Sequence, residues 1–564
     1  MKPHWTVLPE APREFTAALP EYPDLLLQLL YHRGITERKD IERFMDPRYE
    51  DLHDPFLLPD MRKAVRRILT AVRQREDICV IGDYDADGVS GATVLVSVLR
   101  QLNAEPFVYI PDRNKEGYGL NAESIAYARE KHAKLVITVD CGISDYDEVE
   151  QLRALGIDTI IVDHHEVPPK PPRAYAKVNP CMPESAYPFP ELSAAGVAFK
   201  LATALLQEDG AQTAGQEKWL LDVVALSTVA DVMPMTDENR VLVKYGLVVM
   251  GKTRRKGLRE LITRLKLDPQ HLTAYHLGYI LGPHINAASR IDHANQSFRL
   301  LNTASLTEAQ ELADTLMGLN KKRQAMVDEM MREVVVGMPK PVPYLLFAGS
   351  KKWNAGVLGL VAGKVKEKYQ RPTVLYSDQG STSKASARSV EGFDIVEAFA
   401  HCAEYLDQFG GHPMAGGFSF DARNAAAVQQ CLQNYAEGAL RGKDLTPIVR
   451  IDATLALQDV LVENIEEVSK LEPFGRDNAE PVFVVRNATI LEARTMGKSE
   501  QHMKLKLEQD GAKTEAIAFN YAQIGAAPRA GDRVDLVATL SLNEWGNMRR
   551  AELKVIDLHI IAEQ

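Results

Sequence analysis

The sequence lacks any long uninterrupted run of apolar residues. No segment approaches the ~18 consecutive uncharged apolar residues that a membrane-spanning helix requires. The most apolar stretch, residues 219–235, is interrupted by Asp222 and Asp231. The first five residues also lack the basic-then-apolar layout of a secretory signal. We therefore expect a protein with no membrane segment.

Cysteine is scarce, and the five cysteines, residues 79, 141, 181, 402 and 431, show no paired spacing. Zinc ribbons and disulfide-rich secreted domains both depend on regularly spaced pairs. The sequence therefore predicts no disulfide framework and no zinc ribbon, and it favours a reducing, cytoplasmic location.

Positive charge is in short supply, because 66 Lys and Arg residues face 77 Asp and Glu residues, a formal net charge of −11. Such a charge argues weakly against a nucleic-acid partner, since phosphate binding needs lysine and arginine. Carboxylates that hold metal cations would weaken that argument. Local charge is uneven, because residues 252–266 contain seven basic residues and one acid. This run is typical of a solvated helix face, or it could flank the path of a nucleic acid.

The length and composition are those of a globular protein with several domains. The 564 residues are 45% hydrophobic and 25% charged, and a prior of about 150 residues per domain predicts three or four domains. Short apolar runs alternate with helical patterns in two places, which predicts parallel sheets covered by helices. Period-two alternation in the last part predicts a small β-barrel or sandwich. We expect a helical segment at 1–60, a catalytic α/β domain at 61–235, a helical connector at 236–337, a second α/β domain at 338–445 and a β domain at 446–564.

Three predicted strands, residues 78–81, 135–139 and 159–162, each run into aspartate. Open α/β sheets bind ligands outside the carboxyl ends of their strands, so these acids should converge in one crevice. Carboxylates at that density need cations to remain ionised, and mixed oxygen and imidazole ligands suit Mn²⁺ or Mg²⁺. The residues concerned, including an aspartate that ends a further apolar segment, are Asp83, Asp85, Asp87, Asp140, Asp163, His164, His165 and Asp231.

Each of these acids also has an ordinary explanation when it is taken singly. An aspartate after a strand is commonly a helix cap or a turn residue. The spacing of Asp83, Asp85 and Asp87 is also that of a calcium loop, but Val94 stands where such a loop needs glutamate. Their coincidence at several strand ends favours a metal site.

The same residues resemble a known family. Asp85-Ala86-Asp87, Asp140 and Asp163-His164-His165 match the DHH phosphoesterase superfamily, and Gly411-His412 matches its accompanying DHHA1 domain. Within that superfamily the chain is similar to the RecJ family of single-strand-specific 5′→3′ DNA exonucleases. The motifs that carry this closer resemblance are residues 82–88, 111–113, 116–121, 139–142, 230–234, 286–290, 353–359, 386–389 and 471–475.

The resemblance implies a fold and a reaction. Residues 61–235 would form the DHH domain, 338–445 the DHHA1 domain and 446–564 an oligonucleotide-binding (OB) barrel. The chain would cut single-stranded DNA with two Mn²⁺ or Mg²⁺ ions and act in DNA repair and recombination. Single-strand-binding protein and a RecQ-type helicase are the implied protein partners.

The resemblance also implies roles for the acidic residues. Asp140 would bridge the two cations, with Asp83 and Asp85 on one cation and Asp87, His164 and Asp231 on the other. Asp163 and His165 would lie beside them or toward the substrate. His165 could protonate the departing oxygen, or it could be a histidine satisfied in the core.

A cationic pocket for the 5′-terminal phosphate is implied separately, since the arginine fork matches phosphate geometry. Aromatic residues of the barrel would stack on bases. From the residues alone, an arginine here is as readily a surface residue, the glycine-rich segment a turn and an aromatic part of a core. The implied substrate-binding residues are Arg113, Arg290, Ser386, Arg388, His412, Phe474 and Trp545, with Tyr521 as a further aromatic candidate.

Four positions depart from the family pattern. Ile81 stands where many relatives carry a metal-binding histidine, so Asp83 is the expected substitute. His284 and Ser289 stand where arginine and glycine are frequent, and Ala385 where glycine is common.

Two other functions fit parts of the pattern. One is a DHH enzyme that acts on short RNA, cyclic dinucleotides or pyrophosphate, although such relatives are usually shorter and lack the barrel. The other is a replication scaffold without catalysis, against which the intact set of acids counts.

Overall fold

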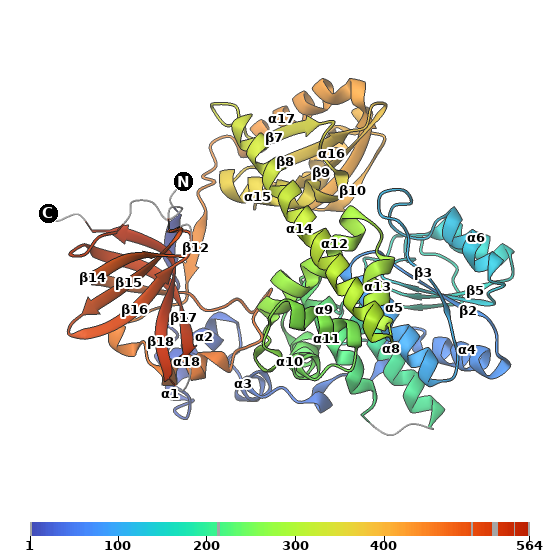
Figure 1. Cartoon of the computed structure of the whole chain (residues 1–564), viewed down its shortest axis with the longest axis horizontal. Helices are drawn as coiled ribbons and strands as arrows, with labels where there is room; N and C mark the ends of the chain where they lie inside the picture. The colour runs from blue at the N-terminus through green and yellow to red at the C-terminus, as the bar shows by residue number, and fades with distance from the viewer. Residues whose placement is uncertain (1–2, 211–214, 498–499, 522–527, 546–547, 562–564) are drawn as a thin grey trace. The chain divides into compact units, whose positions relative to one another are not determined.

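The structure, a computed structural model, describes residues 3–210, 215–497, 500–521, 528–545 and 548–561. Figure 1 shows two α/β domains, a helical region and a β-barrel. The chain divides into two compact units. The first unit comprises His53–Met233 and Tyr245–Pro447, and the second comprises Lys2–Leu52, Pro234–Lys244 and Ile448–Gln564.

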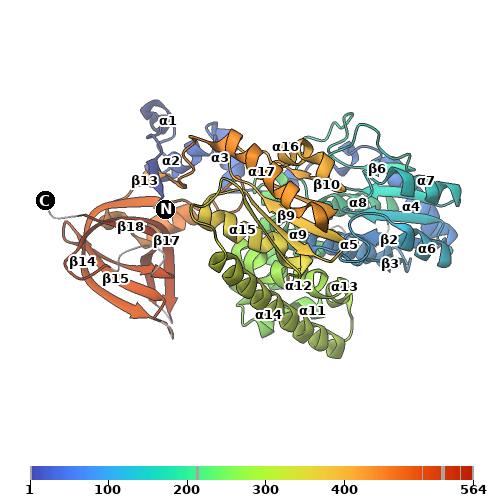
Figure 2. The ribbon, with the colours of Figure 1, turned by 90° about the horizontal axis from the view of Figure 1, so that it is seen from above.

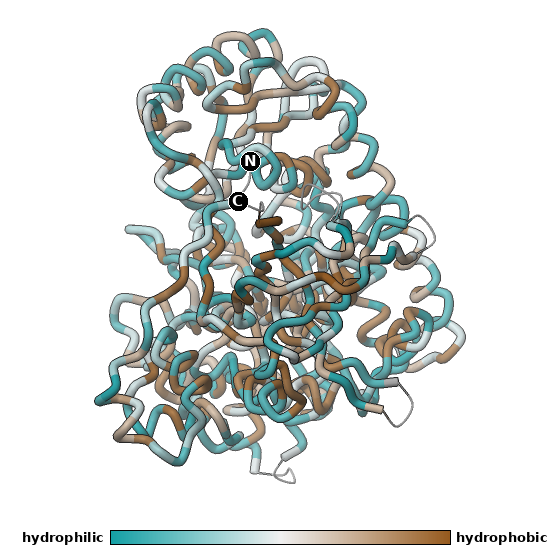
Figure 3. Tube along the Cα trace, turned by 90° about the vertical axis from the view of Figure 1, so that its left-hand side faces the viewer, coloured by the Kyte–Doolittle hydropathy of each residue, from teal (hydrophilic) through white to brown (hydrophobic). Residues whose placement is uncertain are grey.

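Hydrophobic and hydrophilic residues alternate along the traced chain (Figure 3). Among the described residues, no helix combines the length and the apolar character that crossing a bilayer would require.

The first α/β domain is built on a five-stranded sheet of order β3-β2-β4-β5-β6, in which every neighbouring pair is parallel. Parallel strands need crossover connections, and helices supply most of them. Strands β2 and β4 are buried along their whole length, as expected for central strands covered on both faces. The strands are β2 (Ile78–Gly82), β3 (Phe107–Tyr109), β4 (Leu135–Val139), β5 (Asp158–Val162) and β6 (Ala176–Val178). The helices are α4 (Met61–Gln74), α5 (Ala86–Gln101), α6 (Ala122–Glu130), α7 (Tyr146–Ala154), α8 (Ala194–Asp209) and α9 (Leu221–Ala230).

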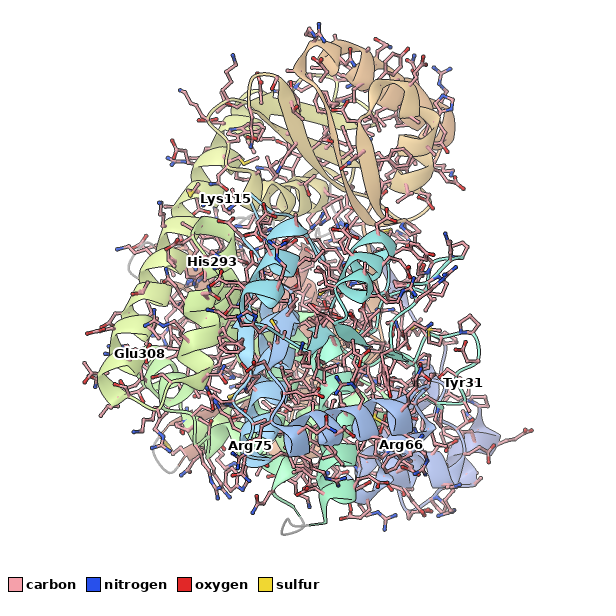
Figure 4. The ribbon with its side chains drawn as sticks, turned by 90° about the vertical axis from the view of Figure 1, so that its right-hand side faces the viewer. Tyr31, Arg66, Arg75, Lys115, His293 and Glu308 are labelled. Atoms are coloured by element: carbon pink, nitrogen blue, oxygen red, sulfur yellow. A yellow bond between two sulfur atoms is a disulfide. The ribbon has the colours of Figure 1, made fainter. Side chains whose placement is uncertain are left out.

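A helical region follows. Its longest helix, α14, packs against α11, α12 and α13, and Glu308 marks its first turn in Figure 4. A π-helical segment, His276–Leu281, leads directly into α12. The helices are α10 (Asp237–Gly251), α11 (Lys256–Arg264), α12 (Gly282–Ile291), α13 (Asn295–Asn302) and α14 (Leu306–Val336).

Three of the seven basic residues at 252–266 contact side chains of this helical region or of the first α/β domain. Arg255 pairs with Asp222, and Arg264 pairs with Glu260 and Asp314. The guanidinium of Arg254 lies 3.6 Å from the ring centroid of Trp219. These contacts favour a structural role for the run.

The second α/β domain has a mixed five-stranded sheet of order β10-β11-β9-β8-β7, in which β7 and β8 are parallel and the other pairs antiparallel. Strand β10 is an exposed edge. The strands are β7 (Leu346–Ser350), β8 (Thr373–Asp378), β9 (Thr382–Arg388), β10 (Gln408–His412) and β11 (Ala415–Asp421). The helices are α15 (Leu358–Tyr369), α16 (Ile395–His401) and α17 (Ala425–Leu440).

One disulfide joins Cys402, at the end of α16, to Cys431 in α17. The prediction that the cysteines are unpaired is therefore wrong for these two, whereas Cys79, Cys141 and Cys181 are free. The two bonded cysteines are 29 residues apart, and the contact between their helices brings them together. Cysteine content therefore no longer supports a reducing location.

The second unit contains a barrel that is closed by pairing between β14 and β17. Its core also includes apolar side chains of the N-terminal helices, and β1 pairs with β12. The strands are β1 (His4–Val7), β12 (Ile448–Ile451), β13 (Ala453–Thr454), β14 (Phe483–Met496), β15 (His502–Gln509), β16 (Ala512–Ala518), β17 (Arg533–Trp545) and β18 (Met548–Ile560). The helices are α1 (Arg13–Ala17), α2 (Asp24–His32), α3 (Arg38–Met45) and α18 (Val462–Ser469). Figure 2 shows the barrel strands curving around this core. The predicted fold class, two α/β domains with a helical connector and a C-terminal barrel, is confirmed.

Candidate active site

The carboxyl ends of three neighbouring strands lie in register. Gly82, the last residue of β2, pairs with Val139 of β4, which pairs with Val162 of β5. The next residue of each strand is an aspartate, and the Asp83 amide still donates to the Val139 carbonyl at 3.1 Å. Strand register therefore places Asp83, Asp140 and Asp163 side by side at one sheet edge.

Three groups of side chains at this edge could each hold a metal ion. Within each group, the candidate ligand atoms lie within 4.8 Å of one another. Asp140 is shared by two groups, and so is His164. The groups are Asp83, Asp85 and Asp140; Asp87, His164 and Asp231; and Asp140, His164 and His165. We call the five aspartates at residues 83, 85, 87, 140 and 231 the carboxylate cluster.

Two of these aspartates also stabilise helix termini. Asp85 caps α5, and its side chain accepts hydrogen bonds from the amides of Asp87 and Gly88 at 2.8 and 3.2 Å. Asp87 accepts from the amides of Ala194 and Ala195, each at 2.8 Å, at the start of α8. The helix-cap explanation and the metal explanation therefore both apply to Asp85.

His164 is held in the tautomer that a metal ligand needs. Its Nδ1 lies 2.9 Å from the Leu192 carbonyl, to which it donates. The Nε2 lone pair therefore faces carboxylate oxygens of Asp140, Asp87 and Asp231, at 3.3, 3.6 and 3.8 Å. An imidazole oriented from behind by a carbonyl is a common arrangement in metal sites.

Asp163 lies behind this group and orients His165. Its carboxylate is fully buried, and its Oδ1 lies 2.8 Å from Nδ1 of His165. Burial alone would raise the pKa of Asp163, but hydrogen bonding and the charge of His165 lower it below its usual value. Burial works against the imidazolium, yet the same bond raises the pKa of His165. The pair therefore favours a charged His165.

Asp83 and Asp140 are the carboxylates whose ionised form the site disfavours most clearly, and each is only 3% exposed. Burial, and then the charges of neighbouring aspartates, raises the pKa of both carboxyls well above its usual value. The buried Oδ1 of Asp83 has no hydrogen-bond partner among the described residues. A buried oxygen without a partner, crowded carboxylates and an imidazole lone pair fit hard divalent cations such as Mn²⁺ or Mg²⁺.

Three guanidinium groups lie close to one another next to the carboxylate cluster. Arg113, Arg290 and Arg388 form no ion pair with a carboxylate in the described part of the chain, and we call them the arginine cluster. Burial first, and then the charge of Arg113, lowers the pKa of Arg290 to about 9. Burial and Arg113 lower the pKa of Arg388 in the same way. Like charges this close favour a bound anion.

Contacts among the two α/β domains and the helical region bring these arginines together. Lys384 of β9 donates to the Asn114 carbonyl at 3.3 Å, in the loop that carries Arg113 and that Lys115 marks in Figure 4. Arg290 donates to the Gly356 carbonyl at 3.0 Å. A Cβ atom on Gly359 would lie 2.8 Å from Nη2 of Arg388, so a larger residue there would displace the end of that side chain.

Comparisons with known proteins agree with this arrangement. Residues 77–228 match the DHH family, N-terminal domain, residues 341–438 the DHHA1 domain and residues 451–557 the RecJ OB domain. The single-stranded-DNA-specific exonuclease RecJ of Bacillus subtilis is 36% identical over 540 residues, which are 94% of this chain and 67% of that relative. The chain belongs to the RecJ family. Escherichia coli RecJ is 33% identical over 96% of this chain and 97% of its own length.

A solved RecJ structure has the same fold. Thermus thermophilus RecJ in complex with Mn²⁺ superposes with a TM-score of 0.85 at 30% identity, covering 99% of this chain and 80% of that one.

In this RecJ family member, the other predicted substrate-binding residues fall into two groups. Ser386 lies beside Arg388, with its Oγ 3.4 Å from Nη1, and His412 is exposed at the end of β10. Phe474 belongs to the second unit and packs against the barrel core, as does Tyr521. Trp545 ends β17, and its side chain lies outside the described residues.

The four residues that depart from the RecJ pattern are all buried. Ile81 is fully buried inside β2, and Asp83 lies in the carboxylate cluster. His284 and Ser289 are buried on α12, and Ala385 is buried in β9.

Four residues that contact these groups have no role among the sequence-based predictions. The Tyr84 ring lies 4.9 Å from the Arg113 guanidinium, between the two clusters. The Tyr118 hydroxyl donates to the Asp140 carbonyl at 2.9 Å. Asn286 accepts from the Ala86 amide at 2.8 Å, and Ser227 donates to Asp87 at 2.6 Å. Among these four residues, only Tyr84 stands between two acidic residues in the sequence, and that position could have indicated that it lies at the site.

Proposed function

We propose that this chain is a metal-dependent exonuclease that degrades single-stranded DNA 5′→3′ to 5′-mononucleotides in DNA repair and recombination. The observation that carries the proposal is the carboxylate cluster beside an arginine cluster without carboxylate partners. The first suits cations at a phosphodiester, and the second suits a terminal phosphate. The relatives named single-stranded-DNA-specific exonuclease support the same activity.

Two Mn²⁺ or Mg²⁺ ions would be held by the carboxylate cluster and His164. Asp83 and Asp85 would bind one ion, Asp87, His164 and Asp231 the other, and Asp140 both. When bound, such ions supply a readily deprotonated water and neutralise charge on the phosphate. The Mn²⁺ and Mg²⁺ complexes of Thermus RecJ support this choice of ions.

The chain's own residues would set the register and move the proton. The arginine cluster and Ser386 would bind the 5′-terminal phosphate, so that the next phosphodiester lies over the carboxylate cluster. Water would bond to phosphorus as the bond to the 3′-oxygen of the first nucleotide breaks. His165, kept protonated by Asp163, would give that oxygen its proton. The shortened strand again carries a 5′-phosphate and can bind the same cluster.

Strand binding and partners complete the proposal. We propose that the barrel at 446–564 binds the downstream strand, with Phe474 and Trp545 as contacts, and that His412 of β10 donates to a phosphate of the DNA. The segments at 1–60, 61–235, 236–337 and 338–445 are the other functional domains of the proposal. Single-stranded DNA arises in the cytoplasm of bacteria during unwinding, so we propose action there, with single-strand-binding protein and a RecQ-type helicase as partners.

A gel assay with 5′-labelled single-stranded DNA, duplex DNA and short RNA, each with Mn²⁺ or EDTA, tests the function. We expect release of labelled mononucleotide from single-stranded DNA with Mn²⁺ alone. Preferential cleavage of short RNA or a cyclic dinucleotide would instead indicate the other DHH phosphodiesterases. Inertness toward every substrate would indicate a scaffold.

A further inference from the structure

Helix α4 of the first α/β domain exposes a basic face on a chain whose net charge is −11. The helix contains no acidic residue, and its apolar side packs against α8 and β6. Figure 4 labels Arg66, along the helix, and Arg75, at its end. The exposed cations of the helix and its C-cap, which we call the α4 basic face, are Arg62, Lys63, Arg66, Arg73 and Arg75.

The carboxylates near α4 leave most of this charge unneutralised. Glu76 and Asp158 both pair with the half-buried Arg67, at 2.8 and 2.6 Å, and not with the basic face. Glu208 lies 3.8 Å from Arg62, but both side chains are exposed, and an ion pair in water is weak. In the part of the chain that the structure describes, the other four members of the face form no ion pair with a carboxylate. The face is therefore available to an anionic partner.

The order of charges along α4 opposes helix stability at its start. Contact with solvent alone explains most charged helix faces, but the partial positive charge at a helix N-terminus favours acids in the first turn. Arg62 and Lys63 occupy that turn, which has no acid, and Asp60 at the N-cap makes no side-chain capping bond. Like charges four residues apart, such as Arg62 and Arg66, also destabilise a helix. Stability therefore does not account for these cations, whereas an anionic partner does.

The composition of the face indicates which anion it suits. All of its members except Lys63 are arginines, whose planar fork pairs with phosphate oxygens. Sites for single-stranded nucleic acid combine cations with exposed aromatic rings on which bases stack. Helix α4 contains no aromatic residue, and the nearby rings of Phe56 and Tyr175 are covered by Arg62 and Lys63, at 4.3 and 4.9 Å. Such a face binds phosphates without stacking on bases, which fits a duplex, whose bases are already paired inside.

We propose that the α4 basic face binds the phosphate backbone of duplex DNA without reading its sequence. The Arg75 end of α4 leads into the amino end of β2, whereas the carboxylate cluster follows the carboxyl end of that strand. The face is thus separate from the candidate active site, and its binding of duplex does not depend on cleavage. Its role is to retain the protein beside the double-stranded region from which a single-stranded tail extends.

The test measures binding of a short blunt duplex with 5′-hydroxyl ends to the full-length protein, by fluorescence anisotropy in EDTA. Arg66→Gln combined with Arg73→Gln should weaken binding about tenfold or more, because two charge-assisted contacts are lost. The slope of log Kd against log salt should fall by about two, one for each phosphate contact. Arg129→Gln combined with Arg332→Gln removes the same charge from exposed arginines of α6 and α14 and should leave binding at wild type. Unchanged duplex binding in the first variant, or an equal loss in the second, would overturn the proposal.

A polyglutamate peptide is the second probe, because an acidic protein segment would also be attracted to clustered arginines. We expect the wild-type protein to bind the duplex more tightly than a polyglutamate of equal charge, because the arginine fork suits phosphate. Arg66→Gln combined with Arg73→Gln should abolish that difference. If this variant lost polyglutamate binding alone and kept duplex binding at wild type, the face would be a protein-binding surface and the proposal would be wrong.

Cleavage measurements keep this inference separate from the proposed function. On a short 5′-phosphorylated single strand with Mn²⁺, Arg66→Gln combined with Arg73→Gln should match the wild type. On a duplex with a single-stranded 5′ tail, the same variant should raise KM about tenfold and leave kcat unchanged, as when binding alone is lost. If the wild-type protein cuts no DNA but the variant still loses duplex binding, the face is supported and the nuclease is not. An equal KM for variant and wild type on the tailed duplex would contradict the retaining role, whatever the activity.

Discussion

The carboxylate cluster and the arginine cluster are neighbours of opposite charge that are assembled in different ways. Asp83 and Asp140 follow adjacent strands of one sheet, where the register places them side by side. The arginines come from a loop of the first α/β domain, a helix of the helical region and a strand of the second α/β domain. They meet through contacts such as Arg290 with Gly356. The first cluster is thus a product of local topology. The arginine cluster depends on how separate regions of the chain pack against one another. A change in that packing would therefore alter the arginine cluster more readily than the carboxylate cluster.

The largest effect should come from the cluster fixed by the sheet. Asp140→Ala removes the carboxylate shared by two ligand groups, and we expect single-turnover cleavage with Mn²⁺ to fall by about 10³-fold or more, as when one group that stabilises developing charge is lost. Circular dichroism should be unchanged. Activity within tenfold of wild type would remove Asp140 from the proposed bridging role.

A smaller and more selective effect should come from the arginine cluster. Arg388→Gln should lower kcat/KM on 5′-phosphorylated DNA by roughly 10- to 100-fold, as expected for a charge-assisted contact. The logarithmic salt dependence of binding should lose a slope of about one. An unchanged salt slope would mean that Arg388 contacts no phosphate, and the two clusters would then not share a substrate.

The smallest effect is a difference in thermal stability, measured in EDTA, between variants of Asp140 and of Asp87. Asp140 has a raised pKa when folded, so its contribution to stability is present below the ordinary carboxyl pKa and is lost as pH rises through the folded value. Asp140→Asn should therefore raise the melting temperature at pH 7 and flatten its decline with pH. Asp87→Asn should lower the melting temperature and reduce the free energy of unfolding by about 1–3 kcal/mol. The reason is that it disturbs buried hydrogen bonds to Ala194, Ala195 and Ser227. Shifts of the same sign in both variants would contradict this distinction.

Sequence reasoning worked best where the structure is local. The predicted strand at 135–139 matches β4, and the acids that follow the strands meet at one edge. The pairing of Cys402 with Cys431 was missed because helix packing, not spacing, creates it. The N-terminal helices gave no sign that their leucines join the barrel core.

The hydrogen bonds of Asp87 matter to anyone who sorts relatives of this protein into active and inactive forms. That carboxylate connects the starts of α5 and α8 and a serine of α9. Selection for a stable fold alone would therefore retain Asp87 in a relative that no longer catalyses the reaction. In the part of the chain that the structure describes, the Asp140 carboxylate does not bind the start of any helix in this way. A relative that retains Asp87 but has lost Asp140 would therefore keep the fold without the nuclease activity.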